Sequence, residues 1–108
     1  MQITLTRYGR DWATLTTEHS ASSHEVPVLV VDGEAYGPDD TIPEPAGSPI
    51  KFIRGERAAV AVLGCAIIAQ ENGTDTHEYQ EACLAFAASS PRRDVHYAMQ
   101  EMWGRIAL

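Results

Sequence analysis

The sequence predicts an α+β fold, in which a small antiparallel sheet of N-terminal hairpins is packed on one face by three C-terminal helices. In the first half, apolar and polar residues alternate or β-branched residues run together, with turn residues between the segments. In the second half, apolar residues recur at three- and four-residue spacing between capping residues. Strand and helix signals that are segregated in this way indicate an α+β arrangement. A length of 108 residues fits one domain, residues 1–108, strand-rich over 1–54 and helical over 55–108.

The first predicted hairpin lies at the N-terminus. Residues 2–8 alternate isoleucine and leucine with threonine, which is the period of a half-buried strand. Gly9-Arg10-Asp11 supplies a turn, and residues 12–17 resume a β-prone composition. Residues 16–25 are polar and have no period, so we expect a loop there.

A second group of strand signals surrounds a tight turn. Val26–Val31 is almost entirely apolar, which favours a strand covered on both faces. Asp32-Gly33 is a strong two-residue turn signal, so residues 34–36 are expected to return as a short strand. The stretch 37–49 holds four of the six prolines and predicts an extended segment. Residues 50–54 are expected to add one more short strand.

The first predicted helix covers residues 56–72 and stops at Asn72-Gly73. It is apolar on nearly every side, which is typical of a helix in the middle of a core. Gly64 within it predicts the close approach of a neighbouring element, so that a side chain at this position would destabilise the fold. The apolar run 58–69 would span only about 18 Å as a helix, against roughly 30 Å for a bilayer core, so no membrane span is expected.

Capping residues introduce the two remaining helices. Thr74 or Thr76 can cap a helix that runs to about Ser89, and Ser90 can cap a third helix with Pro91 at its first position. Each helix has one apolar stripe at helical spacing, namely Tyr79, Ala82, Cys83 and Phe86 on the second, and Val95, Ala98, Met99, Met102, Trp103 and Ile106 on the third.

The N-terminus shows no signal-peptide pattern, so a cytoplasmic location is the default expectation. In that reducing compartment a Cys65–Cys83 disulfide is disfavoured. The two cysteines lie 18 residues apart in apolar helices, match no redox or zinc pattern, and are expected to be small buried hydrophobes.

The charge is concentrated in one segment. The formal net charge is -7, and residues 32–48 contain five acids and no base. Direct nucleic-acid binding usually needs a basic face and is therefore not expected. An acidic segment instead suits a basic protein surface, including that of a nucleoprotein complex. The candidate partner-binding residues are Asp32, Glu34, Asp39, Asp40 and Glu44.

Motifs for catalysis and cofactor binding are missing from the sequence. His77 and Glu81 share a helix face, but the zinc-protease pattern needs a second histidine where Glu81 stands. Nucleotide-binding glycine motifs and a nucleophile elbow are absent as well. We predict no cofactor and no catalytic residue.

The sequence thus predicts a non-enzymatic, acidic protein-binding module that inhibits or regulates a basic partner. In size, charge and lack of catalytic motifs it resembles the small inhibitor proteins of phages and mobile elements, anti-CRISPR proteins among them, although no alignable motif carries the likeness. Two alternatives remain open. One is a small metal-dependent enzyme that uses His77 and Glu81 with His96, and the other is a self-associating subunit that dimerises through the Met99–Trp103 side of the last helix.

Overall fold

The computed structural model describes residues 2–7, 9–19, 25–42 and 56–106, with side chains described within 2–16, 27–42 and 56–101. Its elements confirm the predicted order of strands followed by helices. They are β1 (Gln2–Arg7), β2 (Arg10–His19), β3 (Glu25–Val31), β4 (Glu34–Tyr36), α1 (Ala58–Asn72), α2 (His77–Ala88) and α3 (Arg93–Ile106). The expected strand at 50–54 lies outside the described residues.

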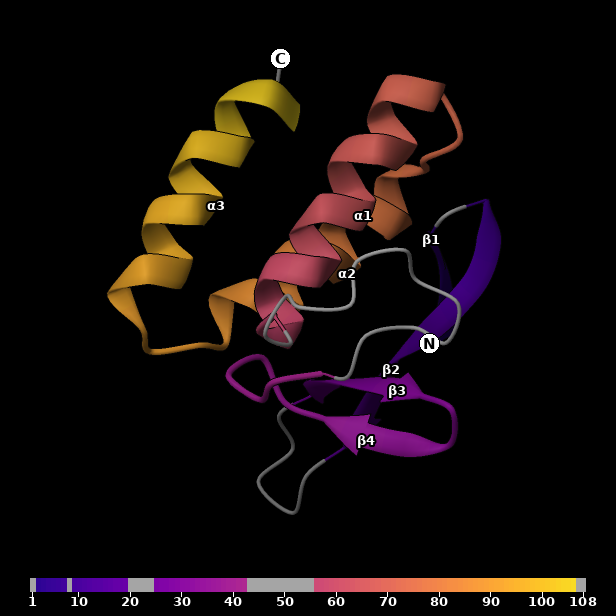
Figure 1. The fold of residues 1–108 in the computed structure, drawn as a ribbon, viewed down its shortest axis with the longest axis vertical. Coiled ribbons are helices and arrows are strands. Elements are labelled where there is room, and N and C mark those ends of the chain that lie inside the picture. Colours follow the sequence, from indigo (N-terminus) through magenta and orange to yellow (C-terminus); the bar gives the residue numbers. More distant parts are fainter. Residues whose placement is uncertain (1, 8, 20–24, 43–55, 107–108) are drawn as a thin grey trace.

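The four strands form one antiparallel sheet in the order β1-β2-β3-β4, so β1 and β4 are its edges. Figure 1 shows the three helices on the same side of this sheet. Helices α1 and α2 contact the strands directly, and α3 packs against α1 and α2. The predicted α+β fold with one covered sheet face is confirmed.

The larger of two apolar clusters among the described residues lies between the sheet and the first two helices. Its residues come from alternate strand positions and from the facing sides of α1 and α2, and they include Leu5, Leu15, Leu29, Val62, Cys65, Cys83 and Phe86. A second, smaller cluster of Ala59, Leu63, Ala87 and Val95, with Met99 packed against it, attaches α3 to the other helices. The side chains of Met102 and Trp103 lie outside the described part.

The caps of the helices follow the sequence closely because capping is a local interaction. Gly73 takes a left-handed conformation (φ 68°) after α1, and its N–H bonds to carbonyls of the last turn. The Thr76 hydroxyl accepts a hydrogen bond from the Tyr79 N–H at 3.1 Å and caps α2. Ser90 accepts from the Arg92 N–H at 3.2 Å, so it caps α3 as predicted, although the regular helix begins at Arg93 rather than at Pro91.

The loop predicted over residues 16–25 is wrong for residues 16–19 and 25, which belong to strands, while residues 20–24 lie outside the described residues. Strand β2 continues to His19, and it pairs with β3 from Thr14↔Val30 to His19↔Glu25. Ladder hydrogen bonds use the backbone alone, so a polar run without periodicity can still form a strand once a partner strand lies beside it.

The prediction that β3 is covered on both faces is also wrong. Leu29 and Val31 are buried in the core, whereas Val28 and Val30 point to the other face and are only partly buried. The apolar run therefore leaves β-branched side chains on the face of the sheet that the helices do not cover.

The close approach predicted at Gly64 is contradicted as well, because a Cβ added there would meet no atom within 4 Å. Gly64→Ala is therefore expected to raise the free energy of unfolding by about 1 kcal/mol, the difference in helix propensity. Gly73→Ala, at a left-handed position, should lower it by a similar amount. Urea unfolding of both variants measures this, and a destabilised Gly64→Ala protein would contradict the open space at this site.

Candidate acidic surface

The β3–β4 turn places the first two candidate carboxylates. Asp32 (φ 50°) and Gly33 (φ 81°) both have positive φ, as a tight two-residue hairpin of the observed antiparallel pair requires. Asp32 and Glu34 are exposed at this turn and at the start of the edge strand β4. The turn predicted from Asp32-Gly33 thus sets both side chains at the rim of the sheet.

Asp40 is held by a second turn directly after β4. Its backbone N–H donates to the Gly37 carbonyl at 3.2 Å, and its carboxylate Oδ2 accepts from the Gly37 N–H at 2.8 Å. This arrangement fixes the side chain next to the end of β4 while leaving Asp40 exposed.

The three carboxylates lie around one short strand, with Asp32 in the turn before β4, Glu34 at its start and Asp40 in the turn after it. Partial burial raises the pKa of Tyr36, and so do the interaction with Glu34 and the negative charges of Asp32 and Asp40. A phenol whose ionisation is opposed by all three must lie within their common field. We name Asp32, Glu34 and Asp40 the acidic edge. Within the described part of the chain, no basic side chain forms an ion pair with any of them.

Asp39, the neighbour of Asp40, is placed differently. Its carboxylate Oδ1 accepts a hydrogen bond from the hydroxyl of Ser90, which is 2% exposed. Its carbonyl oxygen accepts from Arg57 at 3.3 Å, and its charge contributes to the raised pKa of Arg92. The Ser90 carbonyl in turn contacts the ring Nε2 of His96 at 2.6 Å. Asp39 therefore fastens the 37–40 turn to the start of α3, a role that sequence reasoning missed.

Asp39→Ala is expected to lower the free energy of unfolding by about 2 kcal/mol, because it leaves a buried hydroxyl without its charged acceptor. Asp40→Ala, the matched control, removes an exposed acceptor one residue away and should cost less than about 1 kcal/mol. Chemical denaturation compares the two. Equal effects would contradict the assigned role of Asp39.

The fifth candidate, Glu44, lies outside the described residues. The structure therefore brings together Asp32, Glu34 and Asp40, and uses Asp39 inside the fold. Tyr36 interacts with all three carboxylates of the acidic edge. The sequence predicted only that it belongs to a short strand and did not indicate this role.

The histidines do not gather into a centre within the described residues. His77 Nε2 lies 3.1 Å from Glu81 Oε1, and both side chains are largely exposed. His96 is on α3, and its ring contacts the carbonyl of Ser90, just beyond the C-terminal end of α2. His77 is at the other end of α2, which at 1.5 Å per residue is about 16 Å long from His77 to Ala88. No group of three metal-ligating side chains occurs in the part of the chain that the structure describes.

The two cysteines are free and buried, as predicted. Burial raises the pKa of the Cys65 thiol to about 11, and burial together with Cys65 raises the pKa of Cys83 to about 12. Both thiols therefore stay protonated and unreactive at neutral pH in the folded protein. Their burial instead makes the stability of the fold depend on pH in the alkaline range.

Stability is expected to fall as the pH rises above 9. The unfolded thiols lose protons near their ordinary pKa of 9.0, while the folded thiols keep them until about 11 and 12. Between its unfolded and its folded pKa, each thiol can lower the free energy of unfolding by up to about 1.4 kcal/mol per pH unit. Urea unfolding at pH 8 and pH 10 tests this. In the Cys83→Ala control the slope should be smaller, and pH-independent stability over this range would contradict the burial of the thiols.

Comparison with known proteins gives no relative for this chain: it matches no family model, and neither a curated protein nor a solved structure is significantly similar to it. No described helix has both the length and the hydropathy needed to span a bilayer.

Proposed function

We propose that this chain is a non-enzymatic protein-binding module whose acidic edge docks on a basic protein surface and thereby blocks or regulates that surface. The observation that supports it is the placement of three exposed carboxylates around β4, with Asp32 in the β3–β4 turn, Glu34 at the start of β4 and Asp40 in the turn that follows. Charges arranged in this way accelerate the encounter with a basic partner and disfavour acidic ones.

The acidic edge surrounds the short strand β4. Asp32 and Glu34 lie at the β3–β4 turn, at the end of the sheet that Figure 1 shows below the helices, and Asp40 lies in the turn after β4 that leads back toward α1. The basic side chains of Arg57 and Arg92 lie around Asp94 at the start of α3, close to the Asp40 end of the acidic edge, because Arg57 also donates to the Asp39 carbonyl. Asp32 and Glu34 lie at the other end of β4, and no basic side chain of the described residues forms an ion pair with any of the three carboxylates.

The partner class that fits is a protein that presents a cluster of lysine or arginine, such as the nucleic-acid-binding surface of a nucleoprotein complex. Occupying such a surface would compete with phosphate contacts, which depend on the same basic side chains. This is how a small acidic protein without catalytic groups can inhibit a larger machine.

Affinity capture with a salt gradient tests the proposal. The wild-type chain is coupled to a resin through an exposed position in the first turn of α2, at the end of that helix opposite to the Ser90–Asp39 contact, and exposed to extract from the cells that produce it. We expect a basic protein to be retained at about 50 mM salt and released well below 1 M, because screening shortens the range of the interaction from about 14 Å to about 3 Å. Retention of acidic or neutral proteins only, or retention unaffected by 1 M salt, would contradict an electrostatic docking surface.

A further inference from the structure

A β-bulge distinguishes the start of β2. Leu5 pairs with Ala13 but Thr6 pairs with Asp11, so Trp12 is an extra residue with no partner on β1. A bulge turns two successive side chains toward the same face of the sheet. Ala13 belongs to the buried core and Thr14 takes the opposite face, while the half-buried Trp12 both packs against the core and lines a hollow beside its strand.

The β2–β3 register sets a carboxylate beside this tryptophan. Thr14 pairs with Val30, and the same register extended by two residues places Trp12 opposite Asp32. Asp32, however, has already left the strand for the turn, with φ 50°. The two chains therefore separate here instead of pairing, and a hollow of about 340 Å³ opens between them.

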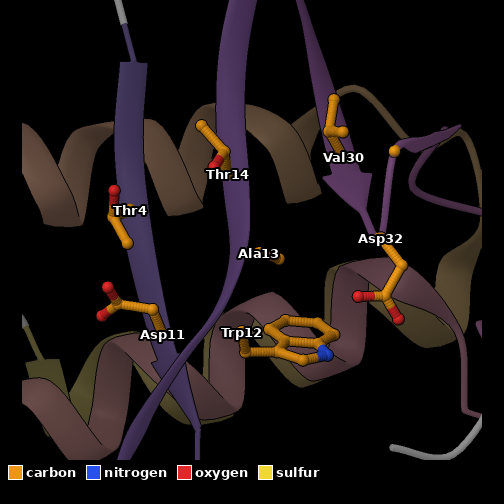
Figure 2. Close-up of a pocket in the computed structure, with 8 residues that line it drawn as sticks. Thr4, Asp11, Trp12, Ala13, Thr14, Val30 and Asp32 are labelled. Carbon is orange, nitrogen blue, oxygen red and sulfur yellow. The ribbon is translucent and has the colours of Figure 1, made fainter.

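Figure 2 shows this hollow with the helices behind the sheet. Trp12 lies at its base, between Asp11 on the β1 side and Asp32 at the end of β3, and Thr4, Thr14 and Val30 form a row across the strands above it. Asp11 and Asp32 are exposed, and within the described residues neither carboxylate forms a hydrogen bond or an ion pair. An aromatic ring between two unengaged carboxylates is suited to an organic cation.

Arginine fits this lining better than lysine. Its planar guanidinium can stack on an indole while it donates two parallel hydrogen bonds to a carboxylate, whereas an ammonium acts as a point charge. The protein itself already uses this combination nearby, since Arg7 lies with its Cζ 5.1 Å from the centre of the Trp12 ring and forms an ion pair with Glu56.

We propose that the hollow is a binding site for one arginine side chain of the partner. The guanidinium stacks against the exposed part of Trp12 and donates to the Asp32 carboxylate, and Asp11 adds negative potential from the other side. Asp32 belongs to both the hollow and the acidic edge, so the two surfaces are continuous. The identity of the partner rests on the proposed function, but the chemistry of the hollow does not.

The test is a titration with the peptide acetyl-Gly-Arg-Gly-amide, followed through the indole N–H resonance of Trp12. The chain has two tryptophans, so Trp103→Phe identifies this resonance. We expect a saturable shift with a dissociation constant in the low millimolar range, weaker binding of the lysine peptide, and no binding of the uncharged citrulline peptide. Asp32→Asn, which suits the same turn geometry, should weaken arginine binding at least threefold.

A control variant separates this proposal from the proposed function. Glu34→Gln with Asp40→Asn removes two charges of the acidic edge that do not line the hollow, so arginine binding should change less than twofold. No saturable shift at about 50 mM peptide, or equal binding by wild type and Asp32→Asn, would overturn the arginine site and leave the acidic edge standing. Saturable, Asp32-dependent binding supports the site even if capture of a basic protein fails.

Discussion

Reversing the three charges of the acidic edge, with Asp32→Lys, Glu34→Lys and Asp40→Lys, is expected to weaken binding to a basic partner by at least about 100-fold. Each substitution replaces an attraction by a repulsion at an exposed position, and like charges across an interface cost several kcal/mol in total. All three residues are exposed, but Asp32 has φ 50° and Asp40 accepts a hydrogen bond from the Gly37 N–H, so urea unfolding first verifies that the variant is folded. Asp39 is left intact because it accepts a hydrogen bond from the buried Ser90 hydroxyl.

The matched control carries the same change of charge elsewhere. Glu71, Glu81 and Glu101 are exposed on the three helices, and their replacement by lysine alters the net charge equally. If the partner binds at the acidic edge, the affinity of the triple control variant should lie within about threefold of the wild-type affinity, because distant exposed charges are largely screened at physiological salt. Equal losses in both triples, measured by surface plasmon resonance with the captured partner, would show that only net charge matters.

Phe86→Ala is expected to lower the free energy of unfolding by about 3–5 kcal/mol. Phe86 is fully buried on α2, in the cluster that joins the sheet to the first two helices. Its removal leaves a cavity that the surrounding strands and helices can fill only in part. A domain of this size has about 5–15 kcal/mol of stability, so the variant should unfold at a much lower urea concentration.

Tyr97→Ala serves as the comparison, because Tyr97 is 65% exposed on α3 and alanine favours a helix. It should shift the midpoint of unfolding only slightly, by less than about 0.5 kcal/mol. A Phe86→Ala protein as stable as Tyr97→Ala would mean that α2 does not pack on the sheet as described.

The sequence predicts those parts of this fold that depend on neighbouring residues. The Asp32-Gly33 turn, the Thr76 and Ser90 caps and the Gly73 stop each follow from one or two side chains and the local backbone. The extension of β2 to His19 does not, because it depends on a partner strand rather than on its own polar residues.

The candidate site could be predicted in part for the same reason. That residues 32–40 are acidic is plain from the sequence, but Asp39 and Asp40 differ only in what the fold brings to each. Asp39 meets Ser90, 51 residues away, while Asp40 meets Gly37 in its own turn. The bulge at Trp12 and the position of this residue beside Asp32 depend on two strand registers taken together, and no single segment carries a signal for them.

The central claim is that the acidic edge is a recognition surface. Hydrogen exchange of backbone amides in the free chain and in its complex with the captured partner tests it most directly. We predict that new protection centres on β4 and the turns on either side of it, residues 32–40, with little change over α1 and α3. Protection confined to the helices, with these turns exchanging as fast in the complex as in the free protein, would contradict it.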